Sequence, residues 1–401
     1  MQHPPAPDSP SRAPAQPGEP QPRPPAVVHA PPRPHGDGDG PPLQRASLRR
    51  IALTLGLGMV LAAAAVAVVT HFASASRVLH RLERADPKWF VLCVLGEVGA
   101  YIGYILAYHD FARADDGPEL SYSMVTEIIA MGFGAFVITS AGGPAVDYWA
   151  LHRAGVTRAE ALARTIGLNA LKFGMFSILA TIAAVLALLG IGGDVPRSVI
   201  VLWIAITGLC GGLAFGLTSG RLGDRLTRRP ERPADPGTGL GMLWRTTAFL
   251  ARELLASALV GVRLVRHMLA RPTRYPAGLL GFGVYWAGDL LCLYAALRAF
   301  GGDVGLIPLV LGYATGYFGT SIPLPAGGTG GVELGMTFAL HLVGVPLAPA
   351  LLGVAAYRFF NFWLPILPAL AVLPLIRRLQ RQLAGVAQER RRRGRLADEP
   401  A

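Results

Sequence analysis

The stretches GAFVITSAGG (134–143) and GTSIPLPAGG (319–328) interrupt two apolar segments in the same way. Each begins with Gly and reaches Ala-Gly-Gly seven residues later. A Gly-Val pair follows each break, at 155–156 and at 344–345, and a further apolar segment follows each pair. Ala-Gly-Gly alone could arise by chance in a chain rich in Ala and Gly. The matching order of several features is what indicates an internal repeat.

The composition is typical of a helical membrane protein. Of the 401 residues, 52% are hydrophobic and only 15% are charged, whereas soluble domains have about 25% charged residues. Apolar stretches of about twenty residues recur along the chain, and a helix of that length crosses the hydrocarbon core of a bilayer. We expect full spans over residues 51–72, 89–108, 166–190, 197–219, 277–300 and 347–376.

Two shorter pairs of segments surround the Gly-rich breaks. The first pair joins 122–140 to a polar, interfacial amphipathic helix over 144–164, and the second joins 304–322 to 329–344. A hairpin that stops inside the bilayer leaves backbone polar groups unpaired, so it survives only where protein or water satisfies them. We therefore expect an all-α polytopic membrane protein with about six full spans and two Gly-broken re-entrant helical hairpins.

Each hairpin lies between two spans, and together they define two repeats. The first repeat starts outside the membrane and the second starts inside, so the two are inverted, as in many secondary transporters. The Pro-rich N-terminal tail has too little apolar area to fold, and the basic linker between the repeats is expected to carry a surface-lying helix. The expected boundaries are 1–44 for the tail, 45–380 for the transmembrane domain, 89–190 for repeat one, 220–276 for the linker, 277–376 for repeat two and 381–401 for a basic tail.

The distribution of charge predicts the topology. The net charge of +12 would suit nucleic-acid binding, but the basic residues lie beside the spans, where they orient helices and meet anionic lipid. The two tails and the linker are all basic, so we expect both termini in the cytoplasm and the chain in the cell (inner) membrane. Cys93, Cys210 and Cys292 lack metal-ligand spacing, so we expect no metal and no cofactor.

Ionisable residues inside apolar stretches are costly, and by default they mark a pathway or a binding site. Glu333 follows the second break and Arg358 lies in the next helix; Asp147 and Asn169 are the first-repeat counterparts. The Glu333–Arg358 pair could neutralise two buried charges structurally, or Arg358 could bind a lipid phosphate. The residues expected to bind or translocate a lipid are Gly142, Gly143, Asp147, Asn169, Pro325, Gly327, Gly328, Gly331, Glu333 and Arg358.

Other ionisable residues carry weaker expectations. Glu97 and Asp289 come early in the two repeats, where they could play matching roles. Lys172 could simply extend its ammonium group toward water while its alkyl stem stays in the apolar layer.

The segment PLPAGGTGGVELGMTFALHLVGVPLAPALLGVAAYRFFNFWLPIL (323–367) resembles the signature of the lysylphosphatidylglycerol synthetase transmembrane region family, also called flippase-like. The first-half stretch SAGGPAVDYWALHRAGVTRAEAL (140–162) is similar to that family's first-half motif. The matching positions of the second half are Pro323, Pro325, Gly327, Gly328, Gly331, Glu333, Gly344, Val345 and Arg358.

The resemblance implies lipid translocation, the flipping of an aminoacylated or otherwise modified phospholipid between leaflets. The implied partners are membrane lipids with an anionic or aminoacylated headgroup. Family members usually carry Arg where Asp147 and Asn169 stand, which would shift a phosphate-binding role in the first hairpin to Arg153 or Arg164. The aminoacyltransferase domain of bifunctional members is expected to be absent, because only a short tail follows the last span.

The alternative function is that of a membrane enzyme, or an accessory subunit, in a glycolipid or isoprenoid-lipid pathway. A lipid-linked transferase would need an acidic metal-binding pair at a membrane face. The sequence offers only ADD at 114–116 and GGD at 192–194 and 301–303, which read as solvated turns. We therefore expect a translocating protein rather than an enzyme.

Overall fold

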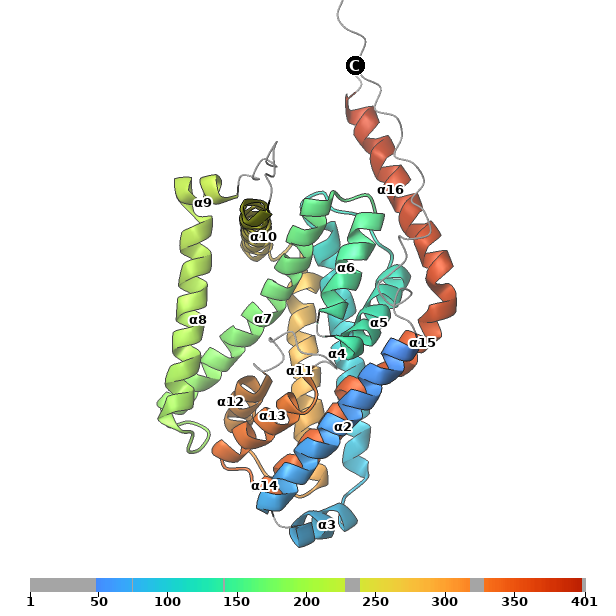
Figure 1. Ribbon diagram of the computed structural model, residues 1–401. Coiled ribbons are helices and arrows are strands. Elements are labelled where there is room, and N and C mark those ends of the chain that lie inside the picture. Colours follow the sequence, from blue (N-terminus) through green and yellow to red (C-terminus); the bar gives the residue numbers. More distant parts are fainter. Residues whose placement is uncertain (1–47, 74, 140, 228–238, 318–327, 399–401) are drawn as a thin grey trace, which may run out of the picture. The chain divides into compact units, whose positions relative to one another are not determined.

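The computed structural model describes residues 48–73, 75–139, 141–227, 239–317 and 328–398, which all lie in one compact unit, Gly40–Ala401. This described part is built of helices and contains no strand (Figure 1). Five of its segments are long and apolar enough to cross a membrane: Lys88–Arg113, Arg158–Leu188, Arg197–Thr218, Pro276–Ala299 and Leu347–Arg393. The prediction of an all-α polytopic membrane protein is confirmed. The expected tail 1–44 lies outside the described residues.

The helices follow the expected order. Repeat one contains α4 (Lys88–Arg113), α5 (Tyr122–Ile138), α6 (Gly142–Arg153) and α7 (Arg158–Leu188). Repeat two contains α11 (Pro276–Ala299), α12 (Leu306–Tyr317), α13 (Gly331–Leu342) and α14 (Leu347–Arg358), which continues into a π-helical segment, Phe359–Trp363. The other elements are α2 (Leu48–Ala73), α3 (Ala75–Glu83), α8 (Arg197–Thr218), α9 (Gly220–Leu226), α10 (Gly239–Ala270), α15 (Ile366–Val372), a 3₁₀ turn (Leu373–Leu375) and α16 (Ile376–Asp398).

The two repeats end their hairpins with the same backbone motif. In repeat one, the amide of Val156 donates to the carbonyl of Leu151 at 3.3 Å, and Gly155 has a φ of 88°. In repeat two, the amide of Val345 donates to the carbonyl of Leu340 at 3.1 Å, and Gly344 has a φ of 99°. This is the Schellman helix ending, in which a left-handed residue is usually Gly. The Gly-Val pairs of the sequence are therefore helix stops.

A histidine completes this motif in both repeats. The Nδ1 atom of His152 lies 3.0 Å from the carbonyl oxygen of Val156, and Nδ1 of His341 lies 2.9 Å from that of Val345. The two histidines are separated by the same 189 residues as Gly155 and Gly344. The internal repeat is thus present in the local geometry as well as in the sequence.

Helices α4 and α11, the first of each repeat, pack closely along one another through pairs of glycines. A Cβ atom on Gly96 would lie 2.5 Å from the carbonyl oxygen of Gly288, and one on Gly288 would meet the carbonyl of Gly96. Gly103 and Gly281 make the same reciprocal contact. The residue number in α4 increases from Gly96 to Gly103, while that of the contacted glycine in α11 decreases from Gly288 to Gly281. The two helices are therefore antiparallel. Equivalent helices that contact each other reciprocally and antiparallel are what an inverted repeat requires.

Two expected boundaries differ from the structure. The single amphipathic helix predicted over 144–164 is wrong, because α6 ends at Arg153 and α7 starts at Arg158. The Schellman ending stops α6, and the Thr157 side chain accepts a hydrogen bond from the amide of Glu160 at 3.3 Å and so caps α7. The following span therefore begins earlier than the predicted residue 166.

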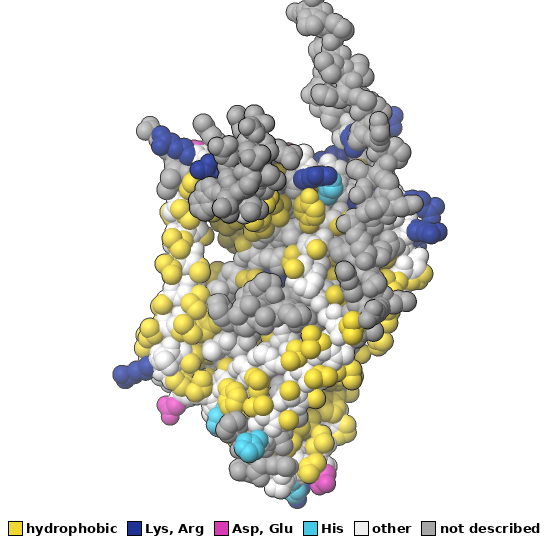
Figure 2. Space-filling model, in the orientation of Figure 1, with side chains coloured by type: hydrophobic (Ala, Val, Ile, Leu, Met, Phe, Trp, Pro, Cys, Tyr) yellow, Lys and Arg dark blue, Asp and Glu magenta, His cyan; other side chains and the backbone are white. Residues whose placement is uncertain are grey.

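The segment between the repeats contains a helix of 32 residues, α10, which packs against α7. The contact is close because a Cβ atom on Gly261 would lie 2.5 Å from the carbonyl oxygen of Ala163. Figure 2 shows hydrophobic side chains along α8, and Lys and Arg side chains toward the ends of the molecule. The basic linker thus includes an element that packs on a membrane-spanning helix.

Candidate functional site

A cavity of about 260 Å³ lies between the two repeats. Its wall includes residues of α4, α5, α6 and α7 from repeat one, and of α11, α12 and the π-helical segment from repeat two. The break of the first hairpin contributes Ala141, Gly143 and Pro144, and at Gly143 the backbone can approach the cavity because glycine has no side chain. The polar side chains in the wall are those of Asp147, Asn169, Lys172, Asn361 and three tyrosines.

Asp147 and Lys172 bring opposite charges to this cavity, from α6 and α7 respectively. Asp147 is 4% exposed and makes no hydrogen bond or ion pair within the described part of the chain. The Nζ atom of Lys172 lies over two aromatic rings, 4.8 Å from the ring centre of Phe173 and 5.6 Å from that of Tyr104. Buried charges are normally paired. Asp147 and Lys172 act on each other electrostatically but share no direct ion pair among the described residues, so a ligand in the cavity could contact both.

The other polar and aromatic side chains of the wall can accept a hydrogen bond or bind a cation. Asn169 uses its Nδ2 atom for its own helix, donating to the carbonyl of Thr165 at 2.9 Å, which leaves its side-chain oxygen available. Tyr104, Tyr285 and Tyr317 line the cavity with their rings. Aromatic faces attract ammonium groups within about 6 Å of the ring centre.

Asn361 connects this cavity to a buried cluster around Asp289 of α11. The Asp289 carboxylate is fully buried and accepts hydrogen bonds from Nδ2 of Asn361 at 2.7 Å, from the hydroxyl of Tyr357 at 3.1 Å, and from the hydroxyl of Tyr313. Because its oxygens are well satisfied, Asp289 orients neighbouring side chains. Asn361 is held in the cavity wall by this carboxylate.

The predicted pair of Glu333 and Arg358 forms, but outside the cavity wall. Nε of Arg358 lies 2.8 Å from Oε1 of Glu333, and both side chains are nearly fully buried. The other carboxylate oxygen accepts a hydrogen bond from the amide of Gly330, which caps the start of α13. The guanidinium also lies 4.1 Å from the ring centre of Phe362. These contacts favour the structural interpretation of the pair, in which two buried charges neutralise each other.

The other predicted site residues divide into three groups. Gly143, Asp147 and Asn169 lie in the cavity wall. Gly142 starts α6 and packs against the carbonyl of Ala135 in α5, where a Cβ atom would not fit. Gly328, with a φ of 76°, and Gly331, which begins α13, shape the second hairpin. Pro325 and Gly327 lie outside the described residues.

Arg164 does not bind a phosphate in this arrangement. Its NH1 atom donates to the carbonyls of Ala114 at 2.7 Å and Ala112 at 3.2 Å, at the end of α4. Its NH2 atom pairs with Glu160 at 2.9 Å. An arginine that satisfies the last carbonyls of a helix stabilises that end. Arg153 ends α6 and is not among the residues that line the cavity.

Lys172 and Asn361 are the cavity residues that sequence reasoning underrated or missed. They occupy equivalent positions, since the 189-residue offset that relates Gly155 to Gly344 also relates Lys172 to Asn361. Lys172 is also one of two lysines in the chain, beside Lys88, among 37 basic residues. The repeat offset was the signal that could have found both positions.

The chemistry that this wall supports is binding. Among the described residues, no group of three or more His, Cys, Asp or Glu side chains could hold a metal ion. The cavity presents one carboxylate, one ammonium group, two amides and several rings, which can hold a small group that carries charge.

Comparison with known proteins identifies the family. No curated protein matches the sequence. Residues 54–369 match the family described as "Lysylphosphatidylglycerol synthase TM region". This match covers repeat one, repeat two as far as residue 369, and every residue that lines the cavity between them. The chain is therefore a member of the lysylphosphatidylglycerol synthase transmembrane region family.

Proposed function

We propose that the protein moves a polar membrane lipid between leaflets, and that the lipid headgroup passes through the cavity between the repeats. The observation that carries this proposal is that two opposite charges, Asp147 and Lys172, face one cavity inside a membrane-spanning unit and act on each other there without a direct hydrogen bond or ion pair. Such charges are expensive inside a bilayer and are retained where a substrate uses them.

The preferred headgroup carries both an amine and a phosphate. The Asp147 carboxylate and the tyrosine rings suit an ammonium group, while Lys172 suits a phosphate oxygen. The name of the family refers to an aminoacylated phospholipid of this kind. We propose accordingly that the protein acts in the cell membrane, with both termini in the cytoplasm.

The inverted repeats supply a means of alternating access. In folds of this plan, one repeat moves against the other around a fixed site near the bilayer midplane. The cavity wall draws on both repeats, and the close glycine contacts of α4 and α11 join them. Movement of α5–α7 relative to α12–α14 would then expose the headgroup to one side or the other.

The experiment uses the purified full chain in liposomes that contain traces of lysylphosphatidylglycerol, phosphatidylglycerol or phosphatidylethanolamine, each with a fluorescent acyl chain. Dithionite, which cannot cross the bilayer, quenches the label of the outer leaflet. Transport predicts that the inner-leaflet label also becomes quenchable in protein-containing liposomes. Inner-leaflet fluorescence as well protected as in empty liposomes would contradict the proposal.

The same liposomes test the enzyme alternative. Lipids are extracted after incubation with candidate glycolipid and isoprenoid-phosphate donors, and they are analysed by mass spectrometry. The proposal predicts that every lipid keeps its mass. A new lipid species that depends on the protein would favour a transferase.

A further inference from the structure

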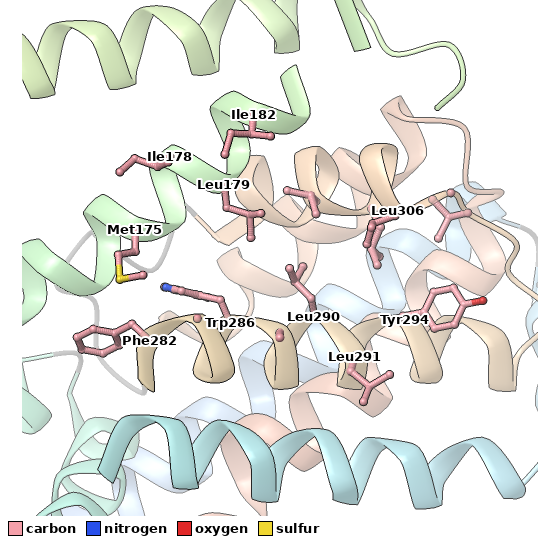
Figure 3. A pocket seen from close by; sticks show the side chains of 16 residues that line it. Met175, Ile178, Leu179, Ile182, Phe282, Trp286, Leu290, Leu291, Tyr294 and Leu306 are labelled. Carbon is pink, nitrogen blue, oxygen red and sulfur yellow. The ribbon is translucent and has the colours of Figure 1, made fainter. Parts of the chain in front are cut away.

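A second, larger pocket of about 810 Å³ lies beside the polar cavity. It is lined by α7, α11, α12 and the turn before α12, and its side chains are almost all hydrocarbon (Figure 3). Figure 3 shows Met175 and Leu179 of α7 directed toward Trp286 and Leu290 of α11. The pocket volume falls in the range of about 300–1,000 Å³ that holds small ligands.

The pocket opens sideways, toward the surroundings of the helices. Ile178 and Ile182 of α7 are 53% and 52% exposed, and Leu306 of α12 is 71% exposed. In a chain of this class such exposed apolar side chains face lipid rather than water. A groove that opens between them admits hydrocarbon from the bilayer.

One wall separates the pocket from the polar cavity. Trp286 lines the pocket, and its indole Nε1 donates to the carbonyl of Lys172 at 2.9 Å. The indole ring centre lies 4.8 Å from that of Tyr285 and 5.6 Å from that of Tyr317, both of which line the cavity. The wall between the two spaces is therefore a single layer of aromatic side chains.

Both spaces follow the same helices. On α7, Lys172 and Phe173 line the cavity and Met175 begins the pocket, which continues along the helix to Ile182. From Lys172 in the cavity wall to Ile182 at the end of the pocket, the helix rises by ten residues, which at 1.5 Å per residue is about 15 Å. That is about half of the roughly 30 Å hydrocarbon core, the reach of one leaflet's acyl chains.

We propose that this pocket binds an acyl chain of the same lipid whose headgroup occupies the polar cavity. The inference rests on the proposed function for the headgroup, and it adds where an acyl chain of that lipid is bound. The headgroup and chain remain on opposite sides of Trp286 while the lipid is bound. A headgroup without chains fills only the smaller space, so it binds more weakly.

Gly283 offers a direct way to fill the pocket. It lies in the pocket wall on α11, and a Cβ atom there would meet nothing within 4 Å, so a large side chain enters free space. Gly208 of α8 is an equally open glycine outside the pocket, which makes Gly208→Trp the matched control for Gly283→Trp. Ile182→Trp at the pocket rim provides a second obstruction.

The test uses the full chain in nanodiscs, with phosphatidylethanolamine that carries a diazirine midway along one acyl chain. Photocrosslinked peptides are identified by mass spectrometry. We expect crosslinks within 175–182, 282–294 and 304–310, about tenfold weaker in Gly283→Trp and unchanged in Gly208→Trp. Unlabelled phosphatidylethanolamine should compete, and glycerophosphoethanolamine should not. Size-exclusion chromatography establishes that each variant is folded, and Ile182→Trp replaces Gly283→Trp if that variant is not.

Crosslinks that map elsewhere, or that persist in both Gly283→Trp and Ile182→Trp, would overturn the chain site. The liposome assay separates this failure from failure of the proposed function. If wild-type protein exchanges lipid while the crosslinks map elsewhere, the chain site is wrong and translocation stands. If crosslinking is lost in Gly283→Trp but wild-type protein exchanges no lipid, the chain site stands and translocation is wrong.

Discussion

The buried charged residues of the two repeats differ in whether they form direct ion pairs. Glu333 and Arg358 form an ion pair at 2.8 Å, whereas Asp147 makes no hydrogen bond or ion pair with other described residues. A buried pair costs stability when one partner is removed, because the other is left as an uncompensated charge. Asp147 and Lys172 act on each other only across the cavity, so removal of either should cost less stability than breaking the direct Glu333–Arg358 pair. Stability and activity should therefore respond to different residues.

Arg358→Ala should destabilise the protein strongly, by about 3–5 kcal/mol, because the buried Glu333 carboxylate loses its counter-charge. Thermal unfolding in detergent, followed by size-exclusion chromatography, measures the effect. The matched control is Arg393→Ala, whose side chain is 63% exposed in a surface pair and whose loss should leave the unfolding temperature nearly unchanged. Equal unfolding temperatures for Arg358→Ala and Arg393→Ala would show that the buried pair is not structural.

Lys172 should be chemically distinguishable because the chain has only one other lysine, Lys88. In a Lys88→Arg variant, reductive methylation modifies Lys172 and the N-terminal amine, which serves as an internal reference. We expect saturating lysylphosphatidylglycerol to slow methylation of Lys172 by about tenfold while the terminal amine reacts as before. Peptide mass spectrometry measures both rates. No protection of Lys172 would place the headgroup elsewhere.

At the residue scale, sequence reasoning found part of the site. Asp147, Asn169 and Gly143 were predicted and lie in the cavity wall. Asn361 was missed because an Asn in an aromatic stretch carries no signal until the repeat offset is fixed. Glu333 and Arg358 were predicted to be near each other, but sequence could not tell that they face away from the cavity, since that depends on how α13 and α14 pack.

At the scale of elements, the glycines of α4 and α11 determine how closely the first helices of the repeats approach. A Cβ atom at Gly96 would collide with the backbone of α11, whereas one at Gly99 of the same helix would meet nothing within 4 Å. Gly96→Leu should therefore push α4 from α11 and cost about 1–3 kcal/mol or more, as overpacking does. Gly99→Leu should unfold at nearly the wild-type temperature. A similar loss in both variants would contradict the packing described here.

The positions of five of the six expected spans could be predicted because hydrophobic length is a local property of the sequence, whereas the expected span 51–72 is not among the described segments long and apolar enough to cross a membrane. The end of α6 could not be placed, since the Gly-Val pair was read as a spacing marker rather than as the helix stop at Gly155. The packing of α10 on α7 was also missed. The composition of α10 predicts a helix on the membrane surface. Its packing on α7 depends on a close contact between Gly261 and Gly167, which are 94 residues apart in the sequence.

At the scale of the whole molecule, the expected topology places the basic segments on one side of the membrane. It can be tested with single cysteines in a Cys210→Ser background, because Cys93 and Cys292 are buried. We expect a membrane-impermeant maleimide added to intact cells to label Asp194→Cys, in the turn before α8. Arg225→Cys, in α9 at the other end of α8, should react only after the cells are opened. Labelling of Arg225→Cys in intact cells would reverse the proposed orientation.

Inverted repeats could be expected from the sequence because the basic segments are expected on one side of the membrane. This requirement limits how many times the chain can cross the membrane between them. The cavity could not be predicted from the sequence, because its wall is formed by seven separate segments that come together only in the fold. Sequence gives the positions of such residues, and tertiary packing decides which of them share a space.

The central claim is that one cavity, built by both repeats, carries the headgroup. The most direct measurement is the rate of leaflet exchange of lysylphosphatidylglycerol in liposomes, compared among wild type, Asp147→Asn, Lys172→Ala and the exposed control Lys88→Ala. The account predicts that Asp147→Asn and Lys172→Ala each slow exchange by about tenfold or more, with Lys88→Ala equal to wild type. Wild-type rates in both cavity variants would contradict it.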